Sequence, residues 1–212
     1  MNVLTQLKGM KKKYTETGYK VQRREPDELR QLAQYLRDFA ASECGLVGSR
    51  FDVVRLIEKW GLRRSTGDIT NPDYVIVEDS ELPGRAAEYR PPPVSGHDAD
   101  SHLFVFRESV WNAACLDDAE ARHILAHEVA HCVLQHPPVS YARQYQDEIV
   151  DQNEDSECQA NRFADELLMD ERLIQSKEGY GSIVEKFGVT NETAVNRLRR
   201  VIAERNLKKG AS

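Results

Sequence analysis

The residues of this chain best suited to chemistry are two histidines and a glutamate in the string His127-Glu128-Val129-Ala130-His131. Residues four apart in an α-helix lie one turn apart on nearly the same face, so both imidazoles can bind one metal ion. Glu128 then lies beside that ion without binding it. This HExxH spacing is typical of zinc peptidases, in which the carboxylate acts as general base toward water that the metal activates.

The residues around the motif decide how it should be interpreted, because short motifs also arise by chance. Acidic residues at 117–120 suit the first turn of a helix, where they complement the positive end of the helix dipole. Apolar residues follow around much of the helix, and Pro137-Pro138 predicts its end. A helix this apolar is expected to be buried, and its histidines and glutamate then need partners. The context therefore favours a metal site.

A catalytic zinc site also needs a third protein ligand and one open position. Glu157 and Asn161 repeat the i, i+4 spacing on a second expected helix, which begins near Glu154. Glu157 can bind the metal, while the amide oxygen of Asn161 can accept the N–H on the far side of a ligating histidine and fix its tautomer. Glu154, one turn earlier on the same face, is a rival ligand.

Two further histidines lie near the motif. His123 precedes His127 by four residues but lies two turns from His131, so one ion cannot bind all three. We expect His123 to be a neighbour of the site. His136 lies about 140° around the helix from His131, so we expect it to point elsewhere unless the helix breaks.

Hydrophobic periodicity predicts that most of the chain is helical. Upstream of the motif, apolar residues at 3.6-residue spacing predict helices over 26–44 and 50–60, with Gly61 as the stop of the second. Downstream, a segment that ends at Gly188 precedes a final helix capped by Thr190. This is the outline of a helix-turn-helix, although most such helix pairs only pack together.

A small sheet is expected between these helices. β-Branched and aromatic runs predict short strands at 74–77 and 103–106. The Pro/Gly-rich stretch over 82–96 predicts a long loop or an irregular edge near the sheet. We therefore expect an α+β fold, mostly helical, with a small β-sheet packed against the HExxH helix.

Composition excludes several classes of protein. The chain of 212 residues is long enough for one domain with a good core, and 40% hydrophobic and 30% charged residues are ordinary for a soluble globular protein. No apolar run approaches the length needed to cross a bilayer and the first residues lack a signal-peptide core, so we expect a cytoplasmic protein with no membrane partner. The four cysteines show no CxxC pair, and we expect reduced thiols.

The net charge of −6 argues against bulk attraction to nucleic acid. Basic residues nevertheless gather at both ends, with seven between positions 8 and 24 and six between positions 197 and 209. We expect residues 1–25 to form a basic, poorly ordered N-terminal arm. Direct DNA contact is a hypothesis that we do not favour, because most such runs are solvated faces.

The HExxH string is followed, thirty residues after His127, by a second motif on the next expected helix. The two strings read Leu125-Ala126-His127-Glu128-Val129-Ala130-His131 and Glu157-x-x-Ala160-Asn161-Arg162-Phe163-Ala164-x-Glu166-Leu167-Leu168-Met169. Together they resemble the ImmA/IrrE family of metallopeptidases, over residues 51–206. The chain departs from the family at Asp170, where a proline is usual, and its first fifty residues have no counterpart.

The resemblance implies a compact gluzincin-like endopeptidase with a zincin-like core. Carried over residue by residue, it implies that His127, His131 and Glu157 bind the metal and that Glu128 is the catalytic base. Zinc is the expected ion, with manganese as the alternative.

Peptide hydrolysis also needs a hydrogen-bond donor to the developing oxyanion. Tyr141 and Tyr145, in the segment that joins the two motif helices, are candidates for this role. Surface or packing tyrosines are the ordinary alternative for both.

The resemblance further implies a substrate, since the family acts on transcriptional repressors. We expect a site-specific cut in a helix-turn-helix repressor that derepresses genes of a phage, mobile element or stress regulon. One alternative is a metal-stabilised regulator that binds DNA or protein without proteolysis, and another is the peptidase of a toxin–antitoxin or phage-defence pair. The metallopeptidase domain is expected over 26–176 and a C-terminal, helix-turn-helix-like segment over 177–212.

Overall fold

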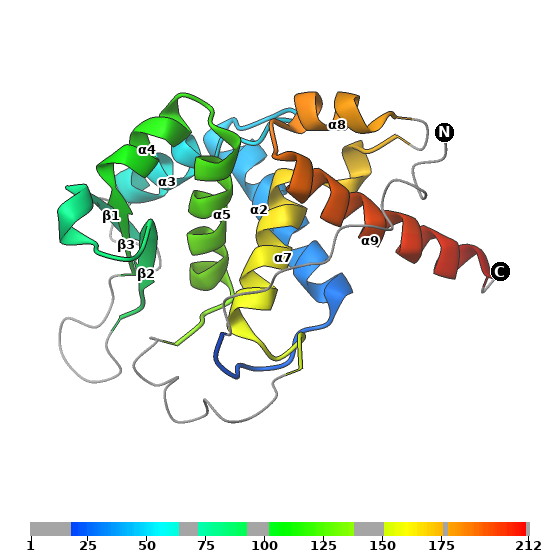
Figure 1. Ribbon diagram of the computed structural model, residues 1–212, viewed down its shortest axis with the longest axis horizontal. Coiled ribbons are helices and arrows are strands. Elements are labelled where there is room, and N and C mark those ends of the chain that lie inside the picture. The colour runs from blue at the N-terminus through cyan, green and yellow to red at the C-terminus, as the bar shows by residue number, and fades with distance from the viewer. Residues whose placement is uncertain (1–17, 64–71, 93–101, 138–150, 176–177, 211–212) are drawn as a thin grey trace.

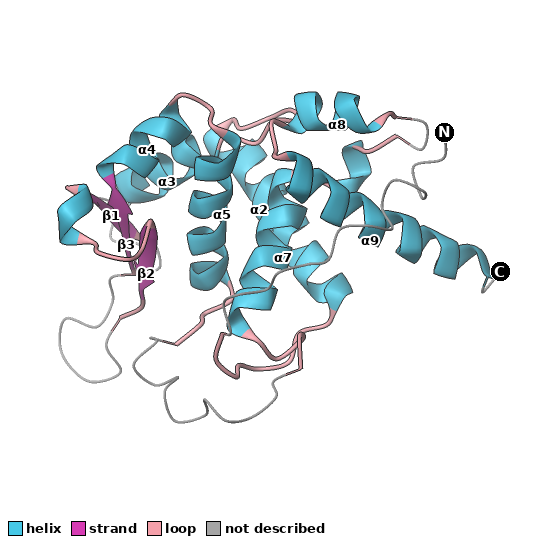
Figure 2. Cartoon of the chain, in the orientation of Figure 1, coloured by secondary structure: helices cyan, strands magenta, loops and turns pink. Residues whose placement is uncertain are grey.

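The computed structural model of the chain describes residues 18–63, 72–92, 102–137, 151–175 and 178–210. Within these ranges the chain forms seven α-helices and a three-stranded sheet (Figure 1, Figure 2). The fold is α+β and mostly helical, as the sequence predicts. None of the helices in these ranges combines the length and apolar character needed to cross a bilayer.

Two helices in the middle of the molecule pack along each other, α5 (Ala119–Val133) and α7 (Ser156–Leu168), and α2 (Pro26–Cys44) packs against α7 (Figure 1). Each buries an apolar stripe in one hydrophobic core that also includes the sheet. The completely buried apolar side chains of α5 are Leu125, Ala126, Val129 and Ala130. Those of α7 are Ala160, Phe163, Ala164, Leu167 and Leu168. The two motif helices are therefore held together by core packing.

Helix α2 has its predicted bounds because both ends carry local signals. Proline occupies its first turn, where the missing N–H is not needed. At its other end Gly45 adopts the left-handed conformation, with φ of 66°, and donates its backbone N–H to the carbonyl of Ala40.

Helix α3 (Val53–Arg63) differs from its prediction at both ends. It begins three residues later than predicted, because the Asp52 side chain accepts the N–H of Arg55 at 2.9 Å and caps the first turn. It also continues past Gly61, which the sequence predicts as its stop. A glycine ends a helix where it takes a left-handed conformation, whereas inside a helix it costs only about 1 kcal/mol.

The sheet has the order β1-β3-β2, with β1 (Asp73–Val77) parallel to β3 (Leu103–Arg107) and β2 (Ala87–Arg90) antiparallel to β3. The runs predicted as strands form β1 and β3. Strand β2 is missed, because it lies in the stretch predicted as a loop or irregular edge. Its four residues, Ala-Glu-Tyr-Arg, have little strand propensity of their own and are extended by pairing with β3. Strand β2 packs on α5, so the sheet lies against the HExxH helix as predicted.

A helix that the sequence does not predict, α4 (Glu108–Cys115), follows β3 directly. Trp111 anchors it, because its ring stacks on that of Tyr74 with 5.0 Å between the centroids. Two short 3₁₀ turns are η3 (Asp79–Glu81) and η5 (Glu171–Leu173).

Helix α5 ends at Val133, earlier than the prolines predict. The backbone N–H of Gln135 bonds to the carbonyl of Cys132 at 3.1 Å, and that of His136 bonds to the carbonyl of His131 at 3.0 Å. Gln135 has φ of 56°. These are the two bonds and the left-handed residue of a Schellman motif, with glutamine where glycine is usual. The motif turns the chain back along the helix.

The N-terminal segment over 18–25 is predicted as part of a poorly ordered arm, but it packs on the start of α7. Tyr19 is only 8% exposed, and its backbone N–H and C=O bond to the hydroxyl and the N–H of Ser156, each at 3.1 Å. Gly18 allows this approach, because a Cβ there would lie 2.6 Å from Ser156 Oγ. The rest of the predicted arm, residues 1–17, lies outside the described residues.

Two helices close the chain, α8 (Tyr180–Phe187) and α9 (Asn191–Gly210). Gly188 ends α8 with φ of 59°, and the Thr190 hydroxyl accepts the N–H of Thr193 at 3.1 Å at the start of α9. Both signals were predicted. The division of the chain at residue 176 stays a prediction.

Helix α9 is tied to α7 by a buried ion pair. Arg197 is 0% exposed and Glu166 is 1% exposed, and their side chains form a salt bridge. Arg30 of α2 lies 3.7 Å from the same carboxylate. A buried charge that loses its partner is costly, so this pair fixes where α9 lies.

Replacement of Arg197 tests this role. We expect Arg197→Met to lower the free energy of unfolding by about 3–5 kcal/mol, because the buried Glu166 loses its main cationic partner and must either stay charged with a weaker one or take up a proton. The double variant Arg197→Met/Glu166→Leu should be more stable than Arg197→Met alone. The control Arg85→Met removes an exposed pair, which should cost at most about 1 kcal/mol. Urea unfolding measures all three, and equal losses for Arg197→Met and Arg85→Met would contradict the prediction.

Candidate metal centre

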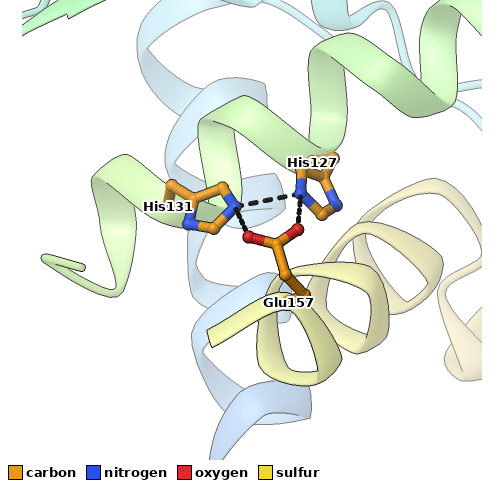
Figure 3. Close-up of side chains that lie close together, drawn as sticks. All are labelled: His127, His131 and Glu157. Carbon is orange, nitrogen blue, oxygen red and sulfur yellow. Dashed lines mark hydrogen bonds and ion pairs between the residues drawn. The ribbon is translucent and has the colours of Figure 1, made fainter. Parts of the chain in front are cut away.

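Three side chains from the two motif helices converge on one point (Figure 3). The Nε2 atoms of His127 and His131, both on α5, lie 2.9 Å apart. The carboxylate of Glu157, on α7, places one oxygen 3.0 Å from Nε2 of His127 and the other 3.4 Å from Nε2 of His131. The ligand atoms of all three lie within 4.8 Å of one another.

This arrangement fits a tetrahedral zinc ion. With zinc–ligand bonds of about 2.1 Å, tetrahedral ligand atoms lie about 3.4 Å apart. The three distances here are 2.9, 3.0 and 3.4 Å, so small side-chain movements would bring all three atoms to bonding distance. Two imidazoles and one carboxylate leave one tetrahedral position open, as in a catalytic site.

The electrostatics of the group favour a cation. Burial opposes charge on Glu157, yet its pKa is well below the ordinary value, because the side chains of His127 and His131 lie against the carboxylate and stabilise its charge. Burial acts to lower the pKa of His127, but the neighbouring carboxylates of Glu157 and Glu128 raise it by more than burial lowers it. The pKa of His127 is therefore raised. The site therefore holds an ionised carboxylate between two basic nitrogens.

Glu128 is held beside this group by the strand that the sequence missed. The backbone N–H of Tyr89, in β2, donates to Glu128 Oε2 at 2.6 Å. Burial raises the pKa of Glu128, and the charge of Glu157 adds to the rise. A carboxylate with a raised pKa is a stronger base, which suits the predicted role.

A contact on the far side of His127 matches the geometry expected of Asn161. Asn161 Oδ1 lies 3.2 Å from Nδ1 of His127. This leaves Nε2 of His127 directed at His131 and Glu157.

His136 contacts the site, because the helix ends before it, which is the exception that the prediction allowed. Its Nδ1 lies 2.8 Å from Nδ1 of His131, and its Nε2 lies 3.1 Å from Oε1 of Gln159. The physical reason is the left-handed Gln135, which ends the helix and turns His136 back. Burial lowers the pKa of His136 to about 4, with a smaller contribution from the His131 imidazole, so His136 is uncharged at neutral pH. The prolines signal only that the helix must end nearby.

His123, the expected neighbour, and Glu154, the rival ligand, are not members of the group. His123 Nε2 lies 3.2 Å from Asp165 Oδ1. Glu154 lies in the turn before α7, not on its face, and pairs with Lys20 at 3.6 Å. Glu157 is thus the carboxylate that joins the two histidines.

The predicted oxyanion donors Tyr141 and Tyr145 lie outside the described residues, so their role stays a prediction. A tyrosine that the sequence did not single out, Tyr19, lies near the group. Burial raises the pKa of its hydroxyl, and the charges of Glu157 and Glu128 add to the rise. No local pattern marks Tyr19, since the arm was expected to be poorly ordered.

Comparison with known proteins agrees with this geometry. A peptidase family model described as the IrrE N-terminal-like domain matches residues 86–199, which is just over half of the chain and includes β2 and both motif helices. The chain belongs to this family of metallopeptidases, and its predicted resemblance to the ImmA/IrrE family is confirmed. Searches of curated proteins and of solved structures gave no significant match.

Two neighbouring glutamates allow a matched test of the metal ligands. We expect Glu157→Gln to weaken zinc binding at least about tenfold, because a neutral amide is a poor zinc ligand. Glu154→Gln, which removes an acid from the adjacent turn, should change the affinity less than twofold. Competition with a chromophoric chelator on metal-free protein measures both. A loss for Glu154→Gln as large as that for Glu157→Gln would contradict the assignment.

Proposed function

We propose that this protein is a zinc-dependent endopeptidase that makes a site-specific cut in a helix-turn-helix transcriptional repressor of a phage, mobile element or stress regulon, and so derepresses genes. The observation that carries the proposal is the convergence of His127, His131 and Glu157 within 4.8 Å, with Glu128 beside them, in a chain of a metallopeptidase family. Three ligands with an open position favour catalysis over a structural role.

The metal would be held by the two imidazoles and the Glu157 carboxylate. When bound, zinc supplies Lewis acidity that polarises a peptide carbonyl and makes water nucleophilic near neutral pH. Manganese would supply the same chemistry with weaker binding to this ligand set.

Glu128 carries the proton in this proposal. Its carboxylate accepts a proton as water attacks the scissile carbonyl carbon, and it then donates that proton to the leaving amine nitrogen as the C–N bond breaks. The backbone N–H of Tyr89 holds one carboxylate oxygen at 2.6 Å and so limits the orientations that Glu128 can adopt.

Strand β2 supports an extended peptide as substrate. Among the described residues it is an edge strand of the sheet, and it packs beside α5. A peptide that pairs with an edge strand is extended and exposes its carbonyls at regular intervals. Such a peptide would pass next to Glu128 and would pair with β2 at groups other than the Tyr89 N–H, which already donates to Glu128.

The alternative of a DNA-binding regulator has less support. Three of the arginines that make the C-terminus basic are engaged within the protein. Arg197 pairs with Glu166, Arg200 pairs with Asp165, and Arg205 donates to the carbonyls of Glu171 and Ile174. These cations are therefore less available to phosphates. A peptidase of a toxin–antitoxin or phage-defence pair would use the same site on another protein.

Replacement of the proposed base tests the function. We expect Glu128→Gln to keep its metal but to cut the repressor encoded beside this gene about 10²–10⁴-fold more slowly, because a general base is lost. A chelator should also stop cleavage by the wild-type protein. Gel electrophoresis and mass spectrometry of the repressor would follow the single cut.

Glu120→Gln is the matched control, since Glu120 is an exposed acid in the first turn of the same helix. It should cut at the wild-type rate. Unchanged cleavage by Glu128→Gln would reject the proposed mechanism, and a non-proteolytic regulator would be indifferent to both substitutions.

A further inference from the structure

A continuous chain of hydrogen-bonded side chains begins at Nδ1 of His131, the ring nitrogen that does not face the candidate metal centre, and leads away from that centre. His131 Nδ1 lies 2.8 Å from Nδ1 of His136, and His136 Nε2 lies 3.1 Å from Oε1 of Gln159. His136 is 3% exposed and Gln159 is 1% exposed, so both side chains are largely shielded from bulk water. The proposed catalytic steps use neither residue.

The orientation of Gln159 is fixed by its two other partners. Its Nε2 donates to the backbone carbonyl of Gln22 at 2.8 Å and to that of Asn153 at 2.6 Å. A carbonyl oxygen can only accept, so the amide nitrogen must face these two atoms. The Gln159 carbonyl oxygen then faces His136 and requires a donor from it.

This requirement sets the position of each proton along the chain. His136 Nε2 carries a hydrogen and donates it to Gln159. A neutral imidazole has one N–H, so Nδ1 of His136 is an acceptor. His131 Nδ1 must therefore carry the hydrogen between the two rings. The lone pair of His131 is then on Nε2, the atom that faces His127 and Glu157 (Figure 3).

We propose that His136 and Gln159 form a positioning relay that holds His131 in the Nδ1–H tautomer, with its Nε2 lone pair directed at the metal. The inference rests on the metal-binding role of His131 in the proposed function. The opposite tautomer would point the hydrogen on His131 Nε2 at the ion and block the bond between this nitrogen and the metal. Contacts of this kind commonly change metal affinity by about 10- to 100-fold.

The relay also makes the N-terminal segment part of the metal centre. Gln22 belongs to the segment over 18–25, and its carbonyl is one of the two atoms that orient Gln159. The other, that of Asn153, comes from the turn before α7. His131 is therefore aligned by two stretches of chain that are far from it in sequence.

Zinc affinity of the full-length, metal-free protein tests the relay through chelator competition. His136→Leu removes the acceptor, and we expect it to weaken zinc binding about 10- to 100-fold. His136→Asn places an amide oxygen at the position of Nδ1, and we expect it to restore affinity to within about fivefold of wild type. His123→Leu, which loses a contact to Asp165 from the same helix, is the control and should bind zinc within twofold of wild type.

Long-range ¹H–¹⁵N NMR spectra of the imidazoles give a readout that a purely structural role would not move. In the metal-free wild-type protein we expect His131 as the Nδ1–H tautomer and His136 as the Nε2–H tautomer. In Gln159→Leu, which leaves both histidines in place, we expect His136 to populate both tautomers. This variant keeps the proposal testable if His136→Leu does not fold.

Three results would overturn the relay: His131 in the Nε2–H form, wild-type zinc affinity in His136→Leu, or no recovery in His136→Asn. A wild-type protein that binds no zinc would instead overturn the proposed function. The tautomers of the metal-free protein would still decide whether the relay exists, so the two failures are distinguishable.

Discussion

Close packing of α5 against α7 is the constraint on which the candidate metal centre depends. Both helices bury alanines completely, and residues this small let two helix axes approach closely. Because of this approach, histidines on one helix and a carboxylate on the other reach a common point with separations of 2.9 to 3.4 Å. A wider separation would leave two imidazoles without a third ligand.

The buried polar groups created by this packing are satisfied by segments from distant parts of the chain. Strand β2 supplies a backbone N–H to Glu128, and α7 supplies Asn161 and Gln159 to the histidine side. The N-terminal segment over 18–25 holds Gln159 through a carbonyl, and α9 supplies Arg197 to a buried glutamate of α7. A buried polar group without a partner is costly. The hydrogen bonds and the ion pair that satisfy these groups therefore hold each of these segments in place.

Elements with local signals were predicted well from the sequence. Helix α2 begins at a proline and ends at a left-handed glycine, and the turn between α8 and α9 has Gly188 and a capping threonine. Strand β2 and helix α4 were missed because their short sequences carry weak propensity, and pairing with β3 or packing of Trp111 decides their conformation. The N-terminal segment was missed for the same reason, since its order comes from contacts with α7.

The sequence by itself determined the chemistry available. One helix carries two histidines one helical turn apart with a glutamate between them, and another helix carries an acid and an amide at the same one-turn spacing. Helix geometry is local, so residue spacing is enough to define these faces. Tertiary structure alone decided that a left-handed Gln135 brings His136 back to His131 and that Tyr89 holds Glu128. These outcomes depend on where separate segments meet, which no local pattern encodes.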